Sequence, residues 1–158
     1  MAHYSTTLMT DAPAVPVLDR LADFANVADW DPGVSDAALI VGEPGRLGSR
    51  YLVTATFGPR RIPLEYEIIE RVDPIDGRAG RVVLVAQAGS FTSHDTITVT
   101  ATPTGSLVQY DAILTLHGLG RVMDWPLHWS FQLIGRSAEQ GLRAELDHLF
   151  AAQDARPE

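Results

Sequence analysis

The sequence predicts an α+β domain in which a curved antiparallel sheet of about seven strands wraps around a long C-terminal helix. Three observations support this fold class. Between residues 36 and 117, apolar and polar side chains alternate with a period of two, as in a sheet with one buried face. Short turns rich in Gly and Pro separate these runs, which favours an antiparallel meander. An apolar stripe at helical spacing then runs from Met123 to Leu149.

Each strand is expected where alternation is bounded by turn residues. The expected strands cover residues 3–9, 36–42, 48–57, 62–72, 81–88, 91–101 and 107–117. One face of these strands collects most of the aromatic and branched apolar side chains, while the other collects Thr and Glu. The apolar face and the stripe of the last helix are therefore expected to bury each other.

A first helix is expected after the first strand, because apolar residues recur at helical spacing over residues 17–24. Thr10 or Asp11 is expected to cap this helix. Its regular part is expected to begin near Pro16, since proline is unfavourable in a helix interior. A turn or short second helix carrying Trp30 should follow.

The C-terminal helix shows a second apolar stripe on its back, which includes Trp125, Trp129 and Leu133. Packing on the sheet explains one apolar face but not two. The simplest cover for the second face is another copy of the chain, which predicts a homodimer through these residues. The alternative is that residues 119–125 are not helical and fold back over the patch.

The composition excludes several classes of function. The 158 residues suit one domain, 1–158, with residues 151–158 as a loose tail. The net charge of −8 disfavours nucleic acid and anionic lipid as partners. The chain has no cysteine, and all 12 basic residues are arginine, so thiolate and Schiff-base chemistry are excluded. Without an apolar run long enough for membrane insertion or a secretory leader, we expect a cytoplasmic protein.

Several short segments occur in a characteristic order. They are residues 21–26 followed by Trp30 and residues 32–33, residues 63–67, residues 95–98, Gly105, residues 110–112 and Gly141 with Leu142. Over about residues 4–150 this order resembles the START-like superfamily, and within it the polyketide cyclase/dehydrase and lipid-transport proteins (SRPBCC). The resemblance implies a helix-grip fold that holds a sterol, lipid, plant hormone or polyketide between sheet and helix. Some members close or dehydrate polyketide rings. Pro16 and the segment 125–129 depart from the pattern.

Asp95 is the most informative polar residue. Strand parity places it on the same face as Phe91 and Ile97, so its carboxyl group should point inward. A buried carboxylate costs several kcal/mol unless it is paired or protonated. Asp95 is therefore either a general acid or base with a raised pKa, or a structural group bonded at the sheet rim. Tyr66 on the inner face and His117 at the end of the last strand complete the expected catalytic set.

The cavity wall is expected to consist of inner-face residues of the sheet and facing residues of the last helix. The expected ligand-binding residues are Trp30, Tyr51, Val53, Phe57, Leu64, Tyr66, Phe91, Tyr110, Ala112, Leu114, Met123, Leu127 and Phe131. The tyrosines offer apolar bulk with one polar handle, although each could equally be a core aromatic. The five histidines have no metal-ligand spacing, and neither a metal nor a cofactor is expected.

Three functions remain open at this point. The first is binding of a small hydrophobic molecule, polyketide-, lipid- or terpenoid-like, in the cavity. The second is a polyketide cyclase or dehydratase in which the cavity folds the substrate and acid/base residues move protons. The third is a protein interaction module that works through the Trp125 and Trp129 surface.

Overall fold

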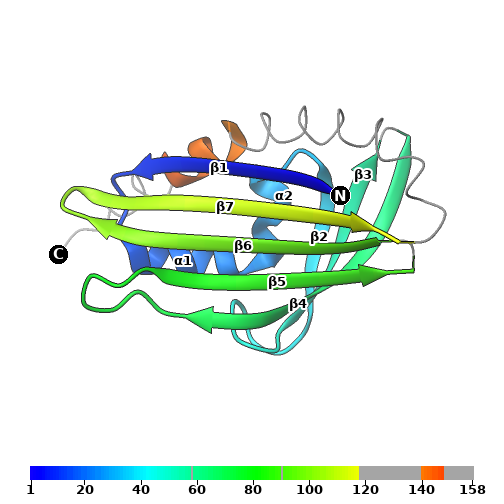
Figure 1. The fold of residues 1–158 in the computed structure, drawn as a ribbon, viewed down its shortest axis with the longest axis horizontal. Coiled ribbons are helices and arrows are strands. Elements are labelled where there is room, and N and C mark those ends of the chain that lie inside the picture. Colours follow the sequence, from blue (N-terminus) through cyan, green and yellow to red (C-terminus); the bar gives the residue numbers. More distant parts are fainter. Residues whose placement is uncertain (58, 90, 118–139, 148–158) are drawn as a thin grey trace.

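A computed structural model describes residues 1–57, 59–89, 91–117 and 140–147 (Figure 1). Seven strands form one curved antiparallel sheet in the order β1-β7-β6-β5-β4-β3-β2. The strands are β1 (Ala2–Thr10), β2 (Val34–Val41), β3 (Arg50–Phe57), β4 (Arg60–Val72), β5 (Gly80–Ala88), β6 (Phe91–Thr102) and β7 (Gly105–Leu116). The predicted α+β class and the seven strands are confirmed, with their ends moved by a few residues.

Strands β2 to β7 follow one another as the predicted meander, whereas β1 pairs with β7 at one edge of the sheet. In this pairing Tyr4 lies opposite Ala112 and Thr6 lies opposite Tyr110. Figure 1 shows β1 in blue alongside β7 in yellow. The N-terminal strand therefore contributes to the same wall of the molecule as the last two strands.

The alternation of side chains sets the inner face, as predicted. In β6 the side chains of Phe91, Ser93, Asp95, Ile97 and Val99 are buried, and those between them are partly exposed. Strand β4 behaves in the same way, with buried and exposed positions alternating through its middle. The period of two thus decides which residues can reach a cavity above the sheet.

The first helical segment has three parts: α1 (Ala14–Ala22), the 3₁₀ turn η1 (Phe24–Asn26) and α2 (Val27–Trp30). The predicted cap is wrong, because Pro13 occupies the N-cap position and no side chain caps the helix. The Thr10 hydroxyl instead accepts a hydrogen bond from the Ala12 amide at 3.2 Å. Pro16 lies inside the first turn of α1, which begins at Ala14. Backbone amides in the first turn have no hydrogen-bond partner within the helix, so a proline without an amide proton is tolerated there.

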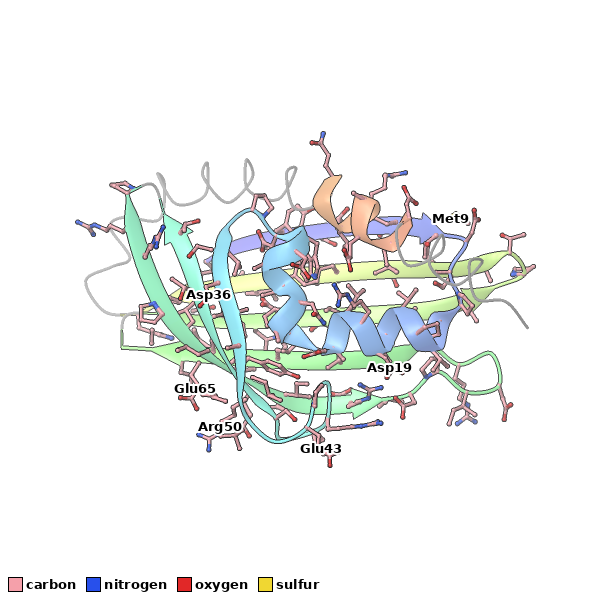
Figure 2. All side chains as sticks on the ribbon, turned by 180° about the vertical axis from the view of Figure 1, so that it is seen from behind. Met9, Asp19, Asp36, Glu43, Arg50 and Glu65 are labelled. Atoms are coloured by element: carbon pink, nitrogen blue, oxygen red, sulfur yellow. The ribbon has the colours of Figure 1, made fainter. Side chains whose placement is uncertain are left out.

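These helices and the helical residues 140–147 lie on one face of the sheet, as Figure 2 shows from behind. Leu142 and Leu146 are buried there, in agreement with the predicted apolar stripe. A Cβ atom on Gly141 would stand 2.1 Å from the backbone oxygen of Trp30, so the helix approaches α2 more closely than any larger residue allows. The Arg20 guanidinium also donates to Glu145 at 2.7 Å, which ties α1 to this helix.

Arg71 on β4 links α1 to the sheet. Its side chain is only 7% exposed, and its guanidinium contacts the carboxylates of Asp19 on α1 and Asp73 after β4. It also donates to the backbone oxygen of Gly45 in the β2–β3 loop. One buried cation therefore joins three separate parts of the fold.

The rest of the predicted C-terminal helix lies outside the described residues. This includes Trp125, Trp129 and Leu133, so the homodimer stays a prediction. Within the described part of the chain, no helix is both long and apolar enough to cross a membrane.

Candidate ligand-binding site

A cavity of about 90 Å³ lies between the inner face of the sheet and the segment that follows α1. Strands β1, β3, β4, β6 and β7 supply one wall, and residues from η1, α2 and the start of β2 supply the other. The lining residues are Tyr4, Phe24, Val27, Asp31, Gly33, Val34, Val53, Ala55, Thr56, Leu64, Tyr66, Phe91, Ser93, Asp95, Tyr110, Ala112 and Leu114. Most of this surface is apolar, which is typical of sites for small organic molecules.

The structure brings eight of the sequence-predicted site residues together around this cavity. They are Val53, Leu64, Tyr66, Phe91, Asp95, Tyr110, Ala112 and Leu114. Their common origin is the inner face of four strands, which the alternation of the sequence already marked. The side chain of Phe57 and the residues Met123, Leu127 and Phe131 lie outside the described residues.

Trp30 and Tyr51 are buried, at 2% and 0% exposure, but they do not line the cavity. The Tyr51 hydroxyl accepts a hydrogen bond from the Gly45 amide at 2.7 Å, which directs it toward the β2–β3 loop. The Trp30 ring packs edge-on against Tyr110, with 5.6 Å between ring centroids. Both residues therefore support the cavity wall from behind.

A polar cluster made of Tyr66, Ser93, Asp95 and Tyr110 lies on the sheet side of the cavity. Asp95 is 3% exposed, and its Oδ1 accepts a hydrogen bond from the Ser93 hydroxyl at 3.2 Å. The hydroxyls of Tyr66 and Tyr110 also interact with its carboxyl group by hydrogen bonding. The four residues come from β4, β6 and β7, so only the paired sheet brings them together.

Burial raises the pKa of Asp95 from 3.8 to about 7, because desolvation penalises the charged carboxylate. The three neighbouring hydroxyls favour the ionised form and oppose this rise, while the charge of Asp31 adds to it. Burial also raises the pKa values of the Tyr66 and Tyr110 phenols, and the Asp95 charge raises both further. Near neutral pH the two phenols therefore keep their protons, while Asp95 exists in both protonation states.

Asp31 is the main site residue that sequence reasoning missed. It follows α2 directly and lines the cavity from the helical side, opposite the sheet. Its Oδ1 accepts a hydrogen bond from the Gly33 amide at 2.7 Å, and burial raises its pKa to about 6. The Asp31-Pro32-Gly33 turn was recognisable in the sequence, but the direction of the Asp31 side chain depends on how the turn docks. Ser93 was also missed, although parity with Asp95 could have identified it.

His117 is not among the cavity-lining residues. It is exposed beyond the end of β7, where its Nε2 lies 2.8 Å from the Thr92 hydroxyl. Within the described residues, no three His, Asp or Glu side chains are grouped so that they could hold a metal ion. Among the described residues that line the cavity, the titratable side chains are Tyr4, Asp31, Tyr66, Asp95 and Tyr110.

Comparisons with known proteins agree with this architecture. A protein of Thermus thermophilus has 15% identity and a TM-score of 0.70, covering 91% of this chain and 96% of its own. A STAR-related lipid transfer protein fragment from Xanthomonas axonopodis has 14% identity and a TM-score of 0.71, covering 91% and 85%. A START superfamily protein from Mycobacterium smegmatis has 13% identity and a TM-score of 0.63, covering 91% and 99%. At these identities the likeness shows the fold alone.

No match was found among curated proteins. A family model described as polyketide cyclase / dehydrase and lipid transport matches residues 1–151. The match spans all seven strands and the described helices. The chain therefore belongs to the polyketide cyclase/dehydrase and lipid-transport family, whose helix-grip fold it shares.

Proposed function

We propose that the protein binds one small hydrophobic molecule in the cavity between the sheet and the helices. The observation that carries this proposal is an apolar cavity with its polar groups gathered in a few places, chiefly the polar cluster. Apolar walls favour transfer of a hydrophobic ligand from water at about 25 cal/mol per Å² of buried surface. The polar cluster would orient the polar group of the ligand, as a few placed donors and acceptors do in small-molecule sites.

Family membership supports the same reading, because hydrophobic ligand binding is typical of this family. The residues proposed to contact the ligand are the eight predicted lining residues together with Phe24, Asp31 and Ser93. Phe24 reaches over the cavity from η1 and packs against Tyr66, with 5.1 Å between ring centroids. It therefore contacts the polar cluster at Tyr66.

The proposal is tested by filling the cavity. Ala112 lies opposite Asp95 in the sheet, so Ala112→Leu would place an additional isopropyl group in the cavity. The matched control is Ala38→Leu, on the exposed side of β2. Binding of a neutral apolar fluorophore, N-phenyl-1-naphthylamine, should be lost in Ala112→Leu and kept in Ala38→Leu. Organic extraction of the purified protein, followed by mass spectrometry, would identify a retained natural ligand.

Equal binding by both variants would contradict the proposal, as would an equal loss in both. Circular dichroism must show that Ala112→Leu keeps its fold, since overpacking a core costs about 1–3 kcal/mol. If it does not fold, Ala55→Leu serves as a second filling variant, because Ala55 lines the cavity and is only partly buried.

A polyketide cyclase or dehydratase is the alternative function, favoured by the pKa of about 7 at Asp95. A carboxylate with this pKa can remove a proton from carbon beside a carbonyl group and return it to a leaving hydroxyl, which departs as water. Once Asp95 holds the substrate proton, the hydroxyl of Tyr66 or Tyr110 would donate to the carbonyl oxygen instead of to Asp95. An aromatic β-hydroxyketone serves as a model substrate, and enone absorbance reports its dehydration. Turnover by the wild type that disappears in Asp95→Asn, with fluorophore binding unchanged, would support catalysis. Turnover that persists in the variant would exclude Asp95 as the base.

A further inference from the structure

The polar cluster presents mainly hydrogen-bond acceptors to the cavity. The Ser93 hydroxyl donates its single proton to Asp95 Oδ1, at 3.2 Å. The Tyr66 and Tyr110 hydroxyls also interact with this carboxyl group, where their protons favour its ionised form. A hydroxyl that donates its proton keeps only acceptor lone pairs for other partners. While Asp95 is ionised, a ligand group that donates therefore matches this wall.

Asp31 places a second carboxyl group on the opposite wall of the same cavity. One of its oxygens accepts the Gly33 amide at 2.7 Å, and its charge is close enough to raise the pKa of Asp95. Among the lining residues that the structure describes, none is Arg or His, and the chain has no lysine. The cavity thus holds two aspartates, and these lining residues supply no cation.

We propose that the cavity takes a small apolar molecule with a protonated amine, and that it discriminates against acidic amphiphiles such as fatty acids. The inference deepens the proposed function and rests on it. An ammonium group carries donors only, so it matches a wall of acceptors. Its charge would relieve the repulsion between Asp31 and Asp95, and the rings of Phe24 and Tyr66 offer faces that attract a cation. A carboxylate head would meet two like charges at low dielectric.

Three ligands with the same octyl chain isolate the effect of the head group: octylamine, 1-octanol and octanoate. At about pH 8 the amine is protonated, octanoate is ionised and both aspartates carry charge. Displacement of N-phenyl-1-naphthylamine measures each affinity, and calorimetry confirms it. Octylamine is expected to bind at least about tenfold more tightly than octanoate, with 1-octanol between them.

Two cavity variants and one control locate the source of this preference. Asp31→Asn and Asp95→Asn each remove a carboxylate charge, and asparagine at 31 retains an oxygen that can accept the Gly33 amide. Each should reduce the ratio of octylamine to octanoate affinity severalfold. Asp36→Asn removes the same charge from an exposed site on β2, labelled in Figure 2, and should leave the ratio unchanged.

The outcomes distinguish a failure of the head-group preference from a failure of the proposed ligand binding. If octanoate or 1-octanol binds as tightly as octylamine, the inference fails while the proposed function stands. If neither the fluorophore nor any octyl ligand binds, the proposed function fails and the inference fails with it. If Asp36→Asn reduces the ratio as much as the cavity variants do, the preference comes from the net charge of −8 and the cavity assignment is overturned.

Discussion

Replacing Asp95 with asparagine is expected to stabilise the folded protein increasingly as the pH rises from about 4 to about 8. Asp95 is buried, and its pKa is about 7 in the folded protein in place of 3.8. The folded state therefore holds the proton more tightly than the unfolded chain does. Because the unfolded chain releases this proton first, the wild type loses stability as the pH rises through this window. Asparagine does not titrate, so the variant escapes that loss.

The size of the effect follows from the two pKa values. At about 1.36 kcal/mol for each pKa unit, a pKa of about 7 against 3.8 corresponds to about 4 kcal/mol. The stability of Asp95→Asn relative to the wild type should thus increase by about 4 kcal/mol between pH 4 and pH 8. An offset that does not depend on pH is also expected, because the amide rearranges the hydrogen bonds with Ser93, Tyr66 and Tyr110. The slope with pH is therefore the diagnostic quantity.

Urea unfolding followed by far-ultraviolet circular dichroism measures this slope, at one-unit steps across the range. Asp36→Asn, which removes an exposed carboxyl group from β2, is measured in parallel as the control. A flat difference for Asp95→Asn would show that the carboxyl group does not titrate in this window. A difference of opposite slope would show that a cation holds Asp95 ionised, and either result would refute the reasoning.

Three further predictions test the packing and the polar cluster. Gly141→Ala should lower the free energy of unfolding by about 1–3 kcal/mol, because its Cβ would stand 2.1 Å from the Trp30 backbone oxygen, and urea unfolding measures this loss. Arg71→Gln should cost about 2–3 kcal/mol in the same assay, since it breaks charge-assisted hydrogen bonds of a side chain that is 7% exposed. Tyr66→Phe should raise the pKa of Asp95 further, because a hydroxyl that favours the carboxylate is removed, and carboxyl ¹³C NMR follows that titration.

Each of these variants has a matched control. In Gly89→Ala the added Cβ atom would lie in open space, so the free energy of unfolding should stay nearly unchanged. Arg81→Gln breaks a more exposed ion pair with Glu70. It should lower the free energy of unfolding by much less than Arg71→Gln does. Tyr51→Phe removes a hydroxyl that accepts the Gly45 amide, and should leave the Asp95 titration in place. Equal effects in a variant and its control would contradict the corresponding prediction.

The local alternation of apolar and polar residues was sufficient to predict the strands and the inward direction of Asp95, Tyr66 and Tyr110. The reason is geometric, since successive side chains in a strand point to opposite faces whatever the rest of the fold does. Pattern was not sufficient to separate cavity-lining residues from core residues. Tyr51 and Trp30 are both buried, but the Tyr51 hydroxyl bonds to the β2–β3 loop and the Trp30 ring packs against Phe24 and Tyr110.

What the sequence by itself determined is therefore the order of elements, the buried face of the sheet and most of its cavity-lining positions, because periodicity and turn chemistry are local. Tertiary structure alone decided three things: the pairing of β1 with β7, the approach of Gly141 to Trp30, and the position of Asp31 opposite Asp95. Each joins residues distant in the chain, and no local periodicity encodes such a distance. The pKa of Asp95 belongs to the same class, because desolvation depends on everything that packs around the carboxyl group.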